Sequence, residues 1–123
     1  MTRAAGLLCV LLSILSSPAH ARDCWSPAPD MSPNQTYERQ LLVVSGKACS
    51  FGLGQSSWSM RGVRLITRPR SGRVVIQGHT VTYVARRGYL GSDHFVFVRD
   101  GMDESNQPVT FTIDMNVQVK ERL

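Results

Sequence analysis

The chain has 123 residues, of which 42% are hydrophobic and 19% charged, and its formal net charge is +5. This length accommodates one domain rather than several. Beyond the first residues, no segment is long and apolar enough to cross a bilayer, so we expect a chain that does not span a membrane. The positive charge is concentrated in the middle of the chain, and the last third is acidic.

The first 21 residues have the layout of a secretory signal peptide. Arg3 gives a positive start, residues 4–15 are uncharged and apolar, and Ala19-His20-Ala21 places small residues where a signal peptidase reads them. The apolar run is well short of the roughly 20 residues that a membrane-spanning helix needs. We therefore expect an exported protein of the periplasm or cell surface, cleaved near Ala21.

Cleavage at that point leaves 102 residues and two cysteines, Cys24 and Cys49. In an oxidising compartment, two cysteines allow one intramolecular pairing. The alternative, a reactive or metal-binding thiol, lacks C-x-x-C spacing and a nearby histidine. We predict a disulfide that ties the N-terminal segment to the domain.

Residues 22–37 are rich in Pro, Ser, Asp and Asn. Pro27, Pro29 and Pro33 argue against a regular strand ladder here, so we expect an extended lead-in. Asn34-Gln35-Thr36 matches a glycosylation sequon, which matters only in a eukaryotic secretory pathway.

From residue 38 to residue 123, short β-rich runs alternate with turn residues, and no internal repeat is visible. The predicted strands are Gln40–Val44, Ala48–Leu53, Gly62–Thr67, Arg73–Ile76, Thr80–Ala85, His94–Arg99 and Val109–Lys120. No amphipathic helix separates them, which indicates an antiparallel sandwich or barrel. The last run alternates apolar and polar residues and would be about 40 Å long as a single strand. Because this is long for a strand, we expect a bulge or a crossing between sheets within it.

The second half of the chain has an ordered series of motifs: Pro-x-x-Gly, a Thr-x-Tyr strand, Gly-aromatic-x-Gly-x-Asp-x-Phe-x-aromatic, Asp-Gly, and an alternating last strand. The matching residues are Pro69, Gly72, Thr82, Tyr83, Gly88, Tyr89, Gly91, Asp93, Phe95, Phe97, Asp100 and Gly101. Over residues 63–119 this pattern resembles the bacterial Ig-like and cadherin-like modules of secreted and cell-surface proteins. The resemblance implies an all-β fold: a single Ig-like (cadherin-like) antiparallel β-sandwich of about seven strands. Both cysteines lie outside the pattern, and Arg86 stands where the family usually has Pro.

The stretch from Gly88 to Asp93 is interpreted as a structural turn. Gly88 and Gly91 permit positive φ, and Asp93 can accept hydrogen bonds from loop N–H groups and fix the start of the next strand. Period-two placement then predicts one shared core, made of Tyr83, Phe95, Phe97, Phe111, Ile113 and Val117.

The sequence offers little for catalysis, metals or cofactors. His79 falls in a turn, and His94 follows Asp93 in a strand, where neighbouring side chains point to opposite faces. The acidic cluster of Asp100, Asp103 and Glu104 lacks EF-hand spacing, so a solvated turn is the better interpretation than a calcium site. We expect no enzymatic activity, no metal and no cofactor.

The arginines are the one feature that indicates binding. Residues 61–87 carry seven Arg and no acid. Arg68, Arg70 and Arg73 crowd one predicted turn, while Arg86 and Arg87 begin another; if the turns are neighbours, they form a one-sided basic patch. The alternative is a compositional bias, with twelve Arg against two Lys, and internal neutralisation by the acidic last third.

These features predict a non-enzymatic, exported binding or structural module of the cell envelope. Its expected partner is a protein or an anionic envelope polymer that contacts the Arg-rich face. Nucleic acid is disfavoured because the protein is exported and its basic segment has little aromatic interleaving. The alternative is a self-assembling subunit that adds a strand at an exposed sheet edge.

Overall fold

The computed structural model describes residues 22–27, 32–52 and 59–123 and builds them from β-strands, with no helix among them. The strands are β1 (Cys24–Trp25), β2 (Gln35–Val44), β3 (Ala48–Gly52), β4 (Ser59–Thr67), β5 (Gly72–Gln77), β6 (Thr80–Ala85), β7 (Gly91–Met102) and β8 (Pro108–Lys120). All seven predicted strands are present, and β1 is an eighth. Leu53, predicted to end a strand, lies outside the described residues.

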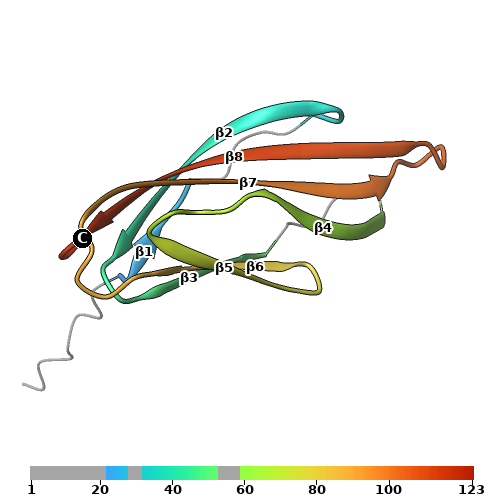
Figure 1. Cartoon of the computed structure of the whole chain (residues 1–123). Helices are drawn as coiled ribbons and strands as arrows, with labels where there is room; N and C mark the ends of the chain where they lie inside the picture. The colour runs from blue at the N-terminus through green and yellow to red at the C-terminus, as the bar shows by residue number, and fades with distance from the viewer. Residues whose placement is uncertain (1–21, 28–31, 53–58) are drawn as a thin grey trace, which may run out of the picture.

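The strands form two sheets that face each other across one core (Figure 1). The five-stranded sheet has the order β1-β2-β8-β7-β4, and the three-stranded sheet has the order β3-β6-β5. One prediction needs correction here, because β2 pairs with β8 in parallel, whereas every other pair of strands is antiparallel. No hairpin links β2 to β8, so their connection does not force an antiparallel direction.

The lead-in contains more regular structure than its prolines suggest. β1 and the first residues of β2 fall within residues 22–37, and β2 begins five residues before the predicted Gln40. Neither Cys24–Trp25 nor Gln35–Tyr37 contains a proline, so the ladder avoids the residues that would interrupt it.

The long last strand alternates as its sequence predicts. Its inward residues, from Val109 to Val119, are all buried, and its outward residues are partly or fully exposed. The expected bulge or crossing between sheets is wrong for this strand, because β8 belongs to the five-stranded sheet alone and pairs with β2 and β7 without a register shift. The irregularities lie in β4 instead, between Met60 and Gly62 and between Leu65 and Thr67.

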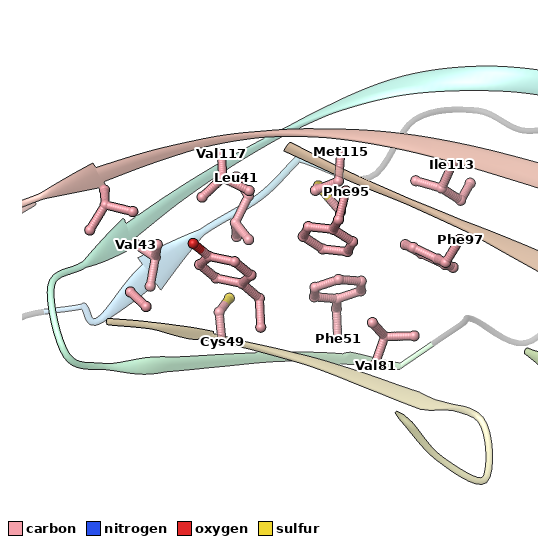
Figure 2. Close-up of a cluster of buried hydrophobic side chains, with 13 residues drawn as sticks. Leu41, Val43, Cys49, Phe51, Val81, Phe95, Phe97, Ile113, Met115 and Val117 are labelled. Atoms are coloured by element: carbon pink, nitrogen blue, oxygen red, sulfur yellow. The ribbon is translucent and has the colours of Figure 1, made fainter. Parts of the chain in front are cut away.

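The core contains side chains from both sheets. Figure 2 shows Leu41, Phe95 and Val117 pointing from the five-stranded sheet towards Cys49, Phe51 and Val81 of the other. Five of the six predicted core residues belong to this cluster, and the rings of Tyr83 and Phe95 stack at 5.5 Å. The sixth, Phe111, is buried outside the cluster, beneath the guanidinium of the buried Arg99 at 5.5 Å.

The predicted disulfide is present between Cys24 and Cys49, with a Cα–Cα distance of 5.7 Å. Cys24 belongs to β1 of the five-stranded sheet and Cys49 to β3 of the three-stranded sheet. The bond therefore joins the two sheets as well as holding the N-terminal segment.

Candidate anion-binding site

The turns that carry the arginines lie towards the same end of the molecule, together with the β2–β3 turn (Figure 1). The Arg86 N–H donates to the Ser71 carbonyl at 3.3 Å, so the β4–β5 turn and the β6–β7 connection are direct neighbours. Between them lies a pocket of about 480 Å³. Its described lining is Gly46, Arg70, Ser71, Gly72, Arg73, Val84, Ala85, Arg86 and Arg87. No acidic residue is among these.

Four of the five predicted arginines line this pocket. The fifth, Arg68, lies on a separate groove of about 620 Å³ that shares only Arg70 and Ser71 with the pocket. We call the pocket lined by Arg70, Arg73, Arg86 and Arg87 the arginine pocket.

Asp93 holds the β4–β5 turn in place. Its Oδ1 accepts the Arg70 N–H at 2.9 Å, and its Oδ2 accepts the Ser71 N–H at 3.1 Å. The Tyr83 hydroxyl donates to the same Oδ2 at 2.7 Å, and the His94 N–H donates to Oδ1 at 2.9 Å. With only 8% of its surface exposed, this carboxylate is a buried anchor for two backbone N–H groups of the pocket wall.

Tyr83 is fitted closely into this arrangement. Burial, followed by the hydrogen bond and charge of Asp93, raises the pKa of the Tyr83 hydroxyl, so the residue remains a neutral donor. Gly72 provides the space for the ring, because a Cβ at residue 72 would lie 2.5 Å from the Tyr83 hydroxyl oxygen. The Gly72 of the sequence pattern is therefore explained by a close approach rather than by a positive φ.

The β6–β7 connection is fixed by the β2–β3 turn. The Ser45 hydroxyl donates to the Arg86 carbonyl at 3.3 Å and accepts the Gly88 N–H at 3.0 Å. Gly88 and Gly91 have φ values of 87° and 128°, as the sequence predicts. Three segments far apart in the chain thus build the backbone of the pocket.

The pocket arginines differ from the other arginines in their partners. Arg64 forms a salt bridge with Asp100 at 2.7 Å, and the hydrogen bond of that pair raises the pKa of Arg64. The guanidinium of Arg39 donates to Ser26 and the Pro27 carbonyl, and burial lowers its pKa. By contrast, no side-chain hydrogen bond or ion pair with the described residues is made by Arg68, Arg70, Arg73 or Arg87.

Arg86 is intermediate, since its guanidinium lies over the Tyr89 ring at 5.6 Å. This contact leaves its charge without a counter-ion among the described residues.

The acidic last third does not neutralise the pocket by direct pairing. Asp100 binds Arg64, and Asp114 meets the imidazole of His94. Asp103 accepts the N–H groups of Ser105 and Gln107, both at 2.9 Å, within its own β7–β8 turn. Figure 1 places that turn at the opposite end of the molecule from the arginine pocket.

The two described histidines lie outside the lining of the arginine pocket. His94 points outward while Asp93 is buried, so the two do not form a catalytic pair, and His79 is exposed in the β5–β6 turn. Among the described residues, no group of three or more His, Cys, Asp or Glu side chains could hold a metal ion. In the same residues there is no helix with the length and apolarity of a membrane span.

The sequence did not identify the residues that support the pocket from distant parts of the chain. Ser45 supports the pocket from the β2–β3 turn and Tyr83 supports it from β6, and Arg39 covers the Phe51 ring at 5.2 Å. A polar residue beside a Gly turn was the only available signal for Ser45.

Comparison with known proteins finds no match to a family model, and neither a curated protein nor a solved structure matches the chain significantly.

Proposed function

We propose that the protein is a non-enzymatic binding module that attaches to an anionic component of the cell envelope through its arginine pocket. The observation that carries the proposal is the convergence of Arg70, Arg73 and Arg87 on one pocket without a side-chain counter-ion among the described residues. A ligand with negative charge would supply the missing partners. Guanidinium groups suit this task because they bind carboxylate, sulfate or phosphate oxygens through several N–H donors.

Preorganisation supports the same proposal. Asp93 and Ser45 hold the backbone of both turns, so little ordering of the chain accompanies ligand binding. Several cations on one surface also attract an anionic polymer over a distance, and this attraction weakens as salt screens it.

The strand order supports an Ig-like (cadherin-like) sandwich as the scaffold of this module. In the immunoglobulin fold, the third, sixth and seventh strands form one sheet, and the second, fifth and fourth belong to the other. Counting from β2, the strands β4, β7 and β8 and the strands β3, β6 and β5 take these places. The disulfide differs, because it joins β1 to β3.

Export is part of the proposal and rests on the signal-like first 21 residues and on the disulfide, a bond typical of oxidising compartments. Intact mass of the protein secreted from its host tests both features. We expect a chain that starts near Arg22 and has no thiol that can be alkylated without reductant; a retained N-terminus would contradict export with cleavage.

Charge reversal with a matched control tests the binding site. Arg70→Glu with Arg87→Glu should elute from immobilised heparin at a clearly lower salt concentration than the wild type. Arg61→Glu with Arg64→Glu changes the net charge equally, on exposed residues of β4 outside the pocket, and should shift elution much less. Equal shifts in the two variants would mean that net charge alone governs retention, and the proposed site would be wrong.

A second candidate function is assembly by strand addition, and the β5 edge favours it. β5 pairs with β6 over six residues without a register shift, and its other edge pairs with no described strand. The β4 edge, by contrast, carries two irregularities of the kind that prevent strand addition. Concentration-dependent mass in light scattering, abolished by Val75→Lys on β5, would support assembly; a monomer at all concentrations would refute it.

A further inference from the structure

A second groove adjoins the arginine pocket on the outer face of the five-stranded sheet. Its volume is about 620 Å³, within the range of small-molecule sites. Its described lining includes the outward side chains of Ser92, His94, Asn116 and Gln118 on β7 and β8, Thr67 at the end of β4, and Arg68 in the β4–β5 turn. Arg70 and Ser71 line both spaces, so the turn held by Asp93 is their common wall.

Besides charged residues and the Tyr89 ring, the groove presents the amides of Asn116 and Gln118 and the hydroxyls of Thr67, Ser71 and Ser92. Asn116 makes no side-chain hydrogen bond to the described residues, and Gln118 uses its amide N–H on Ser92 at 2.8 Å, which leaves its carbonyl oxygen for a ligand. An amide offers a donor and an acceptor in one plane. Sugar hydroxyls are themselves donors and acceptors, so they are well matched to such a surface.

The groove provides little for a lipid chain or for an apolar peptide side chain. Val117 is its one aliphatic residue among the described lining, and that side chain is fully buried in the core. The one aromatic residue of that lining, Tyr89, has its hydroxyl group bonded to the Ser92 carbonyl. The Asp93 carboxylate at its base already accepts four hydrogen bonds, so it repels a ligand less than a free acid would. Arg68 adds a cation without a described counter-ion.

We infer that the arginine pocket and this groove form one extended site for an acidic polysaccharide. The arginines bind the acidic groups of the chain, and Asn116, Gln118 and Ser92 bind the hydroxyls of neighbouring sugar units. This inference rests on the proposed function, because it specifies which anionic polymer the arginine pocket accepts.

Two probes of equal length and charge separate sugar recognition from charge. Oligogalacturonate has carboxylates and hydroxyls, whereas oligoglutamate has carboxylates on a peptide chain. The wild type should bind oligogalacturonate about tenfold more tightly in calorimetric titration, the effect of one or two additional hydrogen bonds. Equal or tighter binding of oligoglutamate would overturn the inference in favour of an acidic protein, and tighter binding of phosphatidylglycerol vesicles would overturn it in favour of a lipid headgroup.

Variants then locate the sugar contacts. Asn116→Ala with Gln118→Ala should weaken oligogalacturonate binding roughly fivefold to tenfold and change oligoglutamate binding less than about twofold. The control pair, Thr110→Ala with Thr112→Ala, lies on the outward face of β8 outside the groove and should change neither. An equal effect of the Asn116 and Gln118 pair on both probes, or no effect, would overturn the inference.

The two pairs of variants distinguish a failure of this inference from a failure of the proposed function. If Arg70→Glu with Arg87→Glu weakens both probes while the Asn116 and Gln118 pair weakens neither, the arginine pocket stands and the sugar groove is wrong. If the arginine pair weakens neither probe, both the proposed function and this inference are wrong.

Discussion

The two ends of the molecule each contain a turn organised by an aspartate, and they differ in where its partners come from. Asp93 accepts N–H groups of Arg70 and Ser71, which lie 23 and 22 residues away in the chain. Asp103 accepts N–H groups two and four residues away, from Ser105 and Gln107. The first turn is therefore defined by the tertiary fold, and the second by its own sequence.

This difference explains why a site is expected at one end only. Asp93 turns its charge inward, and its turn presents Arg70 to solvent without a counter-ion among the described residues. Asp103 uses its carboxylate on the backbone of its own turn and holds no arginine-bearing segment in place. The scaffold role predicted for Asp93 is thus coupled to the proposed binding surface.

The largest effect on stability should follow from removing the disulfide, which lies beside the Asp93 end, since Cys49 is the register partner of Tyr83. Closing a loop of 25 residues stabilises the folded state by roughly 3–4 kcal/mol. Cys24→Ser with Cys49→Ser should lower the free energy of unfolding in urea by about that amount. A loss under about 1 kcal/mol would show that the two sheets are held at this end without the bond.

Asp93→Ala should have the next largest effect. It leaves buried donors without an acceptor, which costs about 1–3 kcal/mol. Because the Arg70–Ser71 turn loses its anchor, heparin elution should also shift to lower salt, although no arginine has changed. A destabilised variant that elutes at the wild-type salt concentration would separate the scaffold from the site and contradict the coupling.

Tyr83, which donates to Asp93, should make the free energy of unfolding depend on pH. Its pKa is raised in the fold, whereas in the unfolded chain tyrosine ionises near pH 10. Its contribution to stability is therefore complete below about pH 10, and above it the unfolded state loses a proton that the folded state keeps. Above about pH 10, the free energy of unfolding of the wild type should fall by about 1 kcal/mol more per pH unit than that of Tyr83→Phe. Parallel pH profiles from urea titrations would contradict this account.

The smallest effect is expected at the acidic end. Asp103→Ala removes two exposed hydrogen bonds within one turn and should cost about 0.5–1 kcal/mol. Heparin elution should not move to lower salt. A loss of stability as large as that of Asp93→Ala would mean that local and long-range turns are equivalent here.

The sequence predicted the features that depend on local pattern. The alternation of β8, the positive φ of Gly88 and Gly91, and the burial of Phe95 and Phe97 all follow from period-two placement and turn chemistry. The disulfide followed from counting, because the predicted mature chain has only two cysteines.

Features that depend on pairing between distant segments were not predictable in the same way. Sheet assembly determines that β2 runs parallel to β8 and that the register shifts occur in β4 instead of β8. No single stretch of sequence encodes either feature. The sequence left open whether the two arginine turns are neighbours. It could not place Arg68 outside the pocket that Arg70 and Arg87 line, or identify Ser45 as a support. The Asp93 pattern indicated N–H acceptance, while its particular donors required the fold.

The most direct test of the central claim compares both ends in one experiment. An amide NMR titration of the folded protein with a heparin tetrasaccharide reports every backbone N–H at once. The account predicts the largest shift changes at Arg70, Ser71 and residues 86–88, and unchanged amides at Ser105 and Gln107 of the β7–β8 turn. Shift changes spread evenly over the exposed basic residues, or centred on another part of the molecule, would contradict it.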